Sequence, residues 1–262
     1  MDEYKIKKYK DRSYESTSSI IRFLSRKRFA DSFKLLDIKS SDLFLDYRCG
    51  DGHLLKLASS IIPPKQIFGY DPAEPMYIQA VKNLAENDVM VTMNISELPY
   101  KEFTKITCME VCEHLTKDKI VELLQNIEKL LADDGKLIMS VPIEVGIPSL
   151  IKNTIGFIKK IFMDKQRRYY SDITLKNYIK ALFGLPCNRT VENLGGVEHI
   201  YGHIGFNHKK FESQLSNYFK IEHKEYSPIN FFGEHLNFQI FYVCQKLFKK
   251  NKFSKKRKYY EI

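Results

Sequence analysis

The chain has 262 residues, of which 44% are hydrophobic and 28% charged, and its net charge is +10. This length allows one sizeable domain with its own core, and the composition excludes wholesale disorder. No apolar run reaches the roughly 18 residues that a membrane-spanning helix needs. The charged N-terminal segment has no apolar core, so we also expect no secretory signal.

The charge and the cysteines point to a cytoplasmic protein with a separate basic end. Residues 246–262 contain eight Lys or Arg residues and one Glu, so the rest of the chain carries only about +3. The five cysteines include no CxxC pair, which excludes a zinc ribbon and favours reduced thiols. We expect a single domain over 1–245, followed by a basic tail at 246–262.

Strand and helix patterns alternate through the first 142 residues. After a helical pattern at 18–36, short apolar strands are predicted at 42–47, 66–71, 89–94, 104–110 and 136–142. Helices are predicted between strands at 51–62, 74–86 and 116–132. This alternation predicts a parallel sheet with helices on both faces. The strands are apolar throughout, as buried parallel strands are.

The pattern changes after Pro142. Two further helices are predicted within 148–183, followed by a Gly- and Asn-rich loop at 188–207, so we expect a helical cover or insert at about 146–207. The pattern ends with a short helix near 209–217 and two strands at about 218–226 and 236–245. These late strands are close enough in sequence to form an antiparallel hairpin at the sheet edge.

The loop after the first predicted strand carries the strongest local signal, in the segment LDYRCGDGHLL at 45–55. Gly50 and Gly52 let the backbone approach a ligand, and the following helix offers free N–H groups. A dinucleotide fingerprint would place Gly or Ala at Leu55 and would avoid acids beside a pyrophosphate. Asp46 and Asp51 instead suit a cation. The charges therefore favour S-adenosylmethionine, which carries a sulfonium and an ammonium and has no phosphate.

Polar residues also end the next two predicted strands. Asp71 lies 25 residues after Asp46, where an acid can accept hydrogen bonds from both hydroxyls of a ribose. Asn94 ends the third strand, where a side-chain amide can meet the edge of an adenine.

Five segments in one order carry a family resemblance over about residues 40–145: LDYRCGDGHLL, GYDPAEPM, MNISELPY, CMEVCEHL and LLADDGKLIMSVP. On these segments the chain resembles class I S-adenosylmethionine-dependent methyltransferases. The resemblance implies an α/β, Rossmann-like fold with a seven-stranded, mostly parallel sheet, helices on both faces and an antiparallel last strand. It implies that the cofactor-binding residues are Asp46, Cys49, Gly50, Gly52, Asp71, Pro72, Asn94, Ile95 and Met109.

Arg48 departs from the family pattern, which usually has Gly at this position. If the position needs a positive φ, Arg costs roughly 1 kcal/mol, and its side chain can crowd the cofactor. Two interpretations stay open. In one, the side chain swings outward and the site binds its cofactor. In the other, the site is weakened and the chain is a non-catalytic binding module that keeps the fold.

Glu110, Glu113 and His114 follow the fourth predicted strand, at the edge where methyl acceptors bind in this family. If this segment is helical, spacings of three and four place all three on one face. They can then hold Mg²⁺ or another divalent metal, or supply a general base. The simpler interpretation is a hydrogen-bonded turn that positions the loop.

The ExxEH pattern also resembles metal-assisted O-methyltransferases of quinone biosynthesis and of small-RNA 3′ ends, in which a metal lowers the pKa of the acceptor hydroxyl. We assign acceptor chemistry to Glu110 and His114. The predicted metal ligands are Glu110, Glu113, His114 and a fourth residue, His203. His199 and His208 are alternatives for the fourth ligand, and each of these histidines is otherwise a loop or capping residue.

The insert and the tail suggest partners. Residues 149–163 form a basic amphipathic pattern, which favours either a lid over the substrate cleft or docking to an anionic membrane. The tail can bind acidic lipid or RNA phosphates, or be a solvated end.

We therefore predict a cytoplasmic methyltransferase, with peripheral contact at the membrane as an open alternative. Its expected acceptor is an oxygen or nitrogen of a small molecule such as a sugar or glycan precursor. A lipid-linked quinone-like acceptor and RNA are the alternatives, and nucleic acid is the less favoured.

Overall fold

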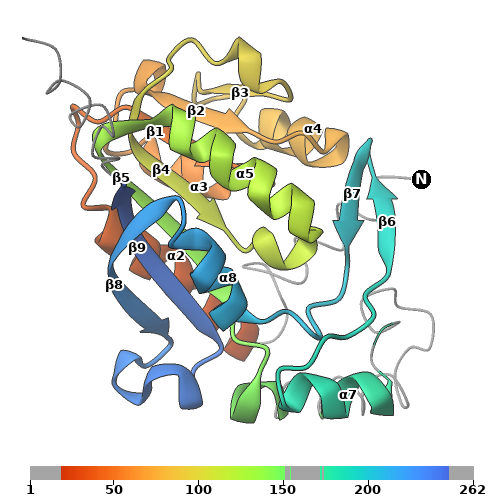
Figure 1. The fold of residues 1–262 in the computed structure, drawn as a ribbon. Helices are drawn as coiled ribbons and strands as arrows, with labels where there is room; N and C mark the ends of the chain where they lie inside the picture. Colours follow the sequence, from red (N-terminus) through yellow and green to blue (C-terminus); the bar gives the residue numbers. More distant parts are fainter. Residues whose placement is uncertain (1–18, 151–153, 155–171, 173, 248–262) are drawn as a thin grey trace, which may run out of the picture.

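The structure is a computed structural model that describes residues 19–150, 154, 172 and 174–247. A seven-stranded sheet lies at its centre (Figure 1). Its strands are β1 (Phe44–Tyr47), β2 (Ile67–Tyr70), β3 (Met90–Thr92), β4 (Phe103–Met109), β5 (Leu131–Pro142), β8 (Phe219–Ser227) and β9 (Gln239–Lys246). They follow the order β3-β2-β1-β4-β5-β9-β8, and β9 is antiparallel to both of its neighbours. The predicted sheet, with its antiparallel last strand and its late hairpin, is confirmed.

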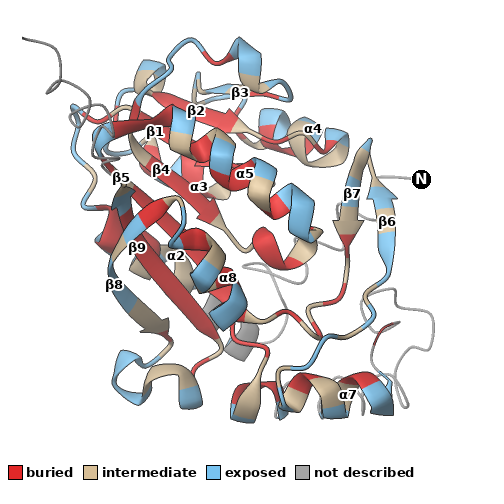
Figure 2. Ribbon diagram, viewed as in Figure 1, coloured by how far each residue is buried: buried red, intermediate tan, exposed pale blue. Residues whose placement is uncertain are grey.

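Helices cover both faces of the sheet because successive strand residues point to opposite sides. On one face, α5 (Lys117–Leu130) and α8 (His208–Leu215) pack against Leu137 and Met139 of β5. On the other, α2 (Ser19–Leu36), α3 (His53–Ala58) and α4 (Glu74–Asn83) pack against Ile138. The central strands β1, β5 and β9 are mostly buried, whereas the edge strands β3 and β8 and the outer helix faces are more exposed (Figure 2). Two apolar cores therefore pack the helices against the two faces of the sheet. Because β1 to β5 are parallel, their carboxyl ends lie along one edge of the sheet.

The insert between β5 and α8 differs in part from the sequence prediction. Its helix α7 (Leu175–Leu182) is N-capped by Thr174, whose side-chain oxygen accepts a hydrogen bond from the Asn177 N–H at 3.1 Å. The region 188–207, predicted as a loop, contains an antiparallel hairpin of β6 (Val191–Leu194) and β7 (Val197–Ile200). Gly195 and Gly196 both take positive φ in its turn, which glycine adopts without strain.

Part of the insert and most of the tail lie outside the described residues. Residues 146–150 are helical, but the predicted amphipathic helix at 149–163 is otherwise not described, and neither is 248–262. Within the described part of the chain, no helix is long and apolar enough to cross a membrane. Short 3-10 helices complete the fold: η1 (Pro64–Gln66), η2 (Ile95–Glu97), η3 (Cys112–His114) and η5 (Asn230–His235).

Candidate active site

The glycine loop folds tightly against the end of β2. Arg48, Gly50 and Gly52 all have positive φ. The backbone N–H groups of Arg48 and Cys49 donate to the carbonyl oxygen of Tyr70, at 2.6 and 3.1 Å. A Cβ at Gly52 would lie 2.8 Å from Leu84 Cδ1, so this position requires glycine for space as well as for conformation.

Three buried carboxyl groups surround this loop. Asp46 ends beside Thr107 of β4, whose hydroxyl donates to it at 2.7 Å. Asp71 accepts hydrogen bonds from the N–H groups of Gly50, at 2.9 Å, and Ala73, at 3.0 Å. Asp51 is also buried. The sequence therefore placed these acids correctly at the carboxyl ends of β1 and β2.

Burial makes Asp46 and Asp71 reluctant to ionise. Burial, against the Thr107 hydrogen bond and together with the charges of Asp71 and Asp51, raises the pKa of Asp46 to about 7. Burial likewise raises the pKa of Asp71 to about 6, against its two backbone hydrogen bonds and the charge of Arg48. A cationic ligand at this place would stabilise the ionised forms, as the sequence argument requires.

The other predicted cofactor residues lie along the same edge. Asn94 caps η2, since its side-chain oxygen accepts from the Ser96 N–H at 3.1 Å, and Ile95 follows it. Cys49 lines the loop, and burial raises the pKa of its thiol well above the ordinary value. Pro72 comes directly after Asp71, and Met109 is the last residue of β4.

Glu113, His114 and His203 form a second cluster, in which one ligand atom from each lies within 4.8 Å of the others. The two histidine Nε2 atoms are 3.2 Å apart, and a Glu113 carboxylate oxygen lies 3.9 Å from His114 Nε2. Glu113 is fully buried, and neither of its carboxylate oxygens has a hydrogen-bond partner among the described residues. Burial, followed by the charge of Glu110, raises its pKa well above the ordinary value.

The His114 ring has a defined orientation. Its Nδ1 lies 2.6 Å from the carbonyl oxygen of Ile200 on β7, and it stacks on His199 at 4.6 Å. Because a carbonyl only accepts, Nδ1 carries the proton and Nε2 presents a lone pair to His203. Burial and the charges of the neighbouring histidines lower the pKa of His114 well below its ordinary value, so the ring is neutral.

The structure does not bring Glu110 into this cluster. Its φ of 55° turns its side chain away from η3, and its carboxylate contacts Arg28 at 3.2 Å and Gln239 at 2.8 Å. The predicted single helical face for Glu110, Glu113 and His114 is therefore wrong, since only Cys112–His114 is helical. His208 also lies elsewhere, on α8 beside Glu234.

Two residues of the cluster escaped the sequence argument. Glu144, which is buried just after β5, lies 3.6 Å from His203 Nδ1. Arg189 donates from its guanidinium to the backbone carbonyl oxygens of Glu113 and Gly202. The sequence could have indicated Glu144, because this acid follows the carboxyl end of the fifth predicted strand. No pattern in the sequence indicated Arg189, which lies in the region predicted as a loop.

The strand order, the glycine loop and the acids that end β1 and β2 define the class I methyltransferase architecture. The chain belongs to the family of methyltransferase domains, whose model matches residues 18–181. The predicted methyltransferase enzyme is thereby confirmed.

Similar proteins of known structure share the fold. The PH0226 protein from Pyrococcus horikoshii OT3 is 14% identical, with a TM-score of 0.58 over 94% of this chain and 100% of that one. Magnesium protoporphyrin IX methyltransferase from Synechocystis PCC 6803, solved with bound SAH, is also 14% identical, with a TM-score of 0.55 over 94% and 97% of the two chains.

A curated relative matches a shorter stretch. Ribosomal protein L11 methyltransferase from Streptococcus pneumoniae is 26% identical over 103 residues. These residues make up 39% of this chain and 32% of the relative, so the match spans about a third of the relative's length.

Proposed function

We propose that this protein transfers the methyl group of S-adenosylmethionine to a hydroxyl oxygen of a small-molecule acceptor, with a divalent metal held by Glu113, His114 and His203. The observation that carries the proposal is the fully buried Glu113 carboxylate, which has no hydrogen-bond partner among the described residues and faces two histidine Nε2 atoms.

The choice of S-adenosylmethionine as methyl donor is supported by the buried acids of the glycine loop and by membership of the methyltransferase family. Asp46 and Asp71 are buried acids that lack a full counter-charge, which suits a sulfonium and an ammonium. The Asp71 carboxylate lies where ribose hydroxyls would donate to it. Membership of the methyltransferase family and the bound SAH of the Synechocystis structure agree with this donor.

The acceptor side is supported by the chemistry of the cluster. With His114 Nδ1 bound to a carbonyl, its Nε2 lone pair faces His203 Nε2 at 3.2 Å, beside the Glu113 carboxylate that has no hydrogen-bond partner among the described residues. A divalent cation would take both Nε2 atoms and the carboxylate as ligands, and the Ile200 carbonyl and Glu144 would orient the rings from outside, as is usual around metal-bound histidines. The residues present therefore fit a metal. When bound, such an ion lowers the pKa of an acceptor hydroxyl and so favours its ionised form.

The ligand set indicates which metal to expect. Two imidazoles and one carboxylate suit Zn²⁺ or Mn²⁺ better than Mg²⁺, which prefers oxygen ligands. The sequence prediction included Mg²⁺ together with Glu110 as a ligand. Without Glu110, the set has one oxygen ligand fewer, and three protein ligands leave room for an acceptor.

Calorimetric titration with Zn²⁺, Mn²⁺ and Mg²⁺, and separately with S-adenosylmethionine, tests the proposal. We expect His203→Ala to lose at least tenfold in metal affinity, while the exposed His223→Ala serves as a matched control and loses none. Both variants should keep their S-adenosylmethionine affinity. Equal metal binding by the two variants would remove the metal from the proposal. Absence of S-adenosylmethionine binding by the wild-type chain would refute the proposal itself.

A further inference from the structure

Helix α7 presents its apolar stripe to solvent. Leu175, Ile179 and Phe183, spaced four residues apart on one face, are 67%, 49% and 71% exposed. Asn177 and Ala181, which point to the other side, are buried. An amphipathic helix normally buries its large apolar residues, so this orientation indicates that the stripe contacts something outside the described fold.

A second exposed apolar group lies on η5. Phe231 is 92% exposed, and its ring meets the ring of Phe232 edge-on with the centroids 5.5 Å apart. Leu236 and Ile229 beside them are also exposed. The exposure of these apolar residues does not result from a lack of contacts at η5, because a polar network joins η5 to the rest of the fold.

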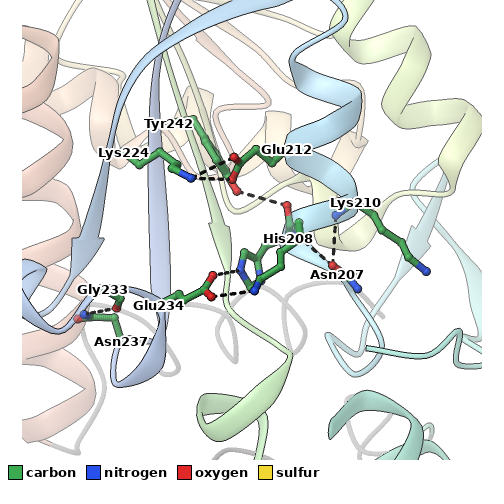
Figure 3. A network of polar contacts seen from close by, with 10 residues as sticks. Asn207, His208, Lys210, Glu212, Lys224, Gly233, Glu234, Asn237 and Tyr242 are labelled. Atoms are coloured by element: carbon green, nitrogen blue, oxygen red, sulfur yellow. Dashed lines mark hydrogen bonds and ion pairs between the residues drawn. The ribbon is translucent and has the colours of Figure 1, made fainter. Parts of the chain in front are cut away.

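That network joins η5 to α8 and to the sheet (Figure 3). Glu234 of η5 accepts from Lys209 at 2.7 Å and lies 3.3 Å from His208 Nε2. Just after η5, the side chain of Asn237 donates to the carbonyl oxygen of Gly233 in η5 at 2.7 Å. The network therefore holds η5 in an orientation in which Phe231 and Phe232 are exposed.

The two exposed groups flank one hollow of about 330 Å³. Ile147 and Phe183 line it on the side of the insert, and Glu234 and His235 line it on the side of η5. The α7 stripe thus reaches the hollow through Phe183, and η5 reaches it through Glu234 and His235. We call the exposed apolar residues on its two sides together the apolar rim: Ile147, Leu175, Ile179, Phe183, Ile229, Phe231, Phe232 and Leu236. Large exposed apolar side chains on both sides of one hollow indicate an interaction site.

The charges beside the rim indicate the partner. Lys176 and Lys180 alternate with the stripe on α7, and neither has an ion pair among the described residues. Lys209 differs, since Glu234 neutralises it. Protein interfaces are depleted in lysine, whereas anionic lipid attracts each basic residue near its surface. Apolar side chains flanked by unpaired lysines are typical of contact with a bilayer.

We propose that the apolar rim docks on an anionic lipid bilayer, with Phe231 and the α7 stripe inserted at the headgroup level. This inference goes beyond methyl transfer and does not depend on the metal cluster. It uses surfaces separate from residues 149–163 and the basic tail, for which the sequence predicted membrane contact.

Co-sedimentation of the full chain with vesicles tests the docking, using vesicles of phosphatidylcholine alone and of phosphatidylcholine with phosphatidylserine. We expect the wild-type chain to bind the anionic vesicles. Ile179→Ser should weaken binding roughly fivefold and Phe231→Ser roughly tenfold. The matched control is Ile78→Ser on α4, because Ile78 is 52% exposed and close to Ile179 in kind and exposure. It should bind like the wild type.

Three outcomes would overturn the proposal. The first is absence of wild-type binding to anionic vesicles. The second is equal binding by all variants, which would place the contact elsewhere on the chain. The third is a wild-type dimer in light scattering that Phe231→Ser converts to a monomer without any vesicle binding, which would assign the rim to a second copy. Circular dichroism of each variant checks that it is folded.

Discussion

We expect the Asp46→Asn variant to be more stable than the wild-type chain at pH 8 and to bind S-adenosylmethionine less tightly. Asp46 is buried, and its pKa is raised from 3.8 to about 7. A folded-state pKa above the unfolded value means that the folded chain binds the proton more tightly. Ionised Asp46 therefore destabilises the fold fully above pH 7, and the penalty disappears as the pH falls towards 4.

The size of the effect follows from the shift. About three pH units correspond to roughly 4 kcal/mol at pH 8, and less than about 1 kcal/mol remains at pH 4. The amide of the Asp46→Asn variant would have an unpaired buried N–H, which costs about 1–3 kcal/mol of stability. The net stabilisation at pH 8 is therefore smaller than the roughly 4 kcal/mol that removal of the buried charge gives. The amide cost is the same at both pH values. The difference between the gains at pH 8 and pH 4 is therefore the cleaner quantity, at roughly 3 kcal/mol.

Urea unfolding at pH 8 and pH 4 measures this difference, with the exposed Asp134→Asn as the matched control. The control should show no comparable change between the two pH values. Calorimetry at pH 8 should show weaker S-adenosylmethionine binding by Asp46→Asn, because the carboxylate charge is lost. A gain that does not depend on pH would contradict the assignment of the buried charge to Asp46.

Three further substitutions test the glycine loop. Arg48→Gly should raise the free energy of unfolding by up to about 1 kcal/mol because φ is 63°, and Arg48→Ala, which keeps the strain, should give no gain. Gly52→Ala should lower the free energy of unfolding by about 1–2 kcal/mol, since its Cβ would crowd Leu84 at positive φ, and an unchanged melting temperature would refute this reasoning. Asp71→Ala should reduce S-adenosylmethionine affinity at least tenfold in calorimetry, as the loss of a charge-assisted hydrogen bond implies, while Asp134→Ala should not.

The sheet and the positions of the glycine loop and its acids were predictable because they depend on local signals. Short apolar strands followed by acids and glycines specify both the strand and the turn that ends it, and Asp46, Gly50 and Asp71 lie where these patterns place them. The bounds were less predictable. The predicted helix at 51–62 begins only at His53, because Gly52 is left-handed, and ends at Ala58.

The acceptor side was less predictable because it depends on the tertiary fold. The turn of the β6–β7 hairpin was indicated by Gly195-Gly196, but its strands are mostly half-buried or exposed and lack the apolar alternation of a buried strand. That hairpin carries Ile200, which orients His114. The Glu110 side chain points away from the cluster because its backbone has a positive φ of 55°. A glutamate gives no sequence signal for a positive φ, which non-glycine residues adopt uncommonly.

The glycine loop and the cluster of Glu113, His114 and His203 share one electrostatic feature. Each keeps carboxyl groups in a buried position where the protein supplies too little positive charge: Asp46 and Asp71 at the loop, and Glu113 beside the histidines. Buried charges without counter-charges cost stability, so such groups mark places where a ligand completes the electrostatics. Arg48 has a charge that acts on both Asp71 and His199, which connects the two sites electrostatically. Its departure from glycine is therefore consistent with a residue that balances charge between them, at the cost of a strained backbone.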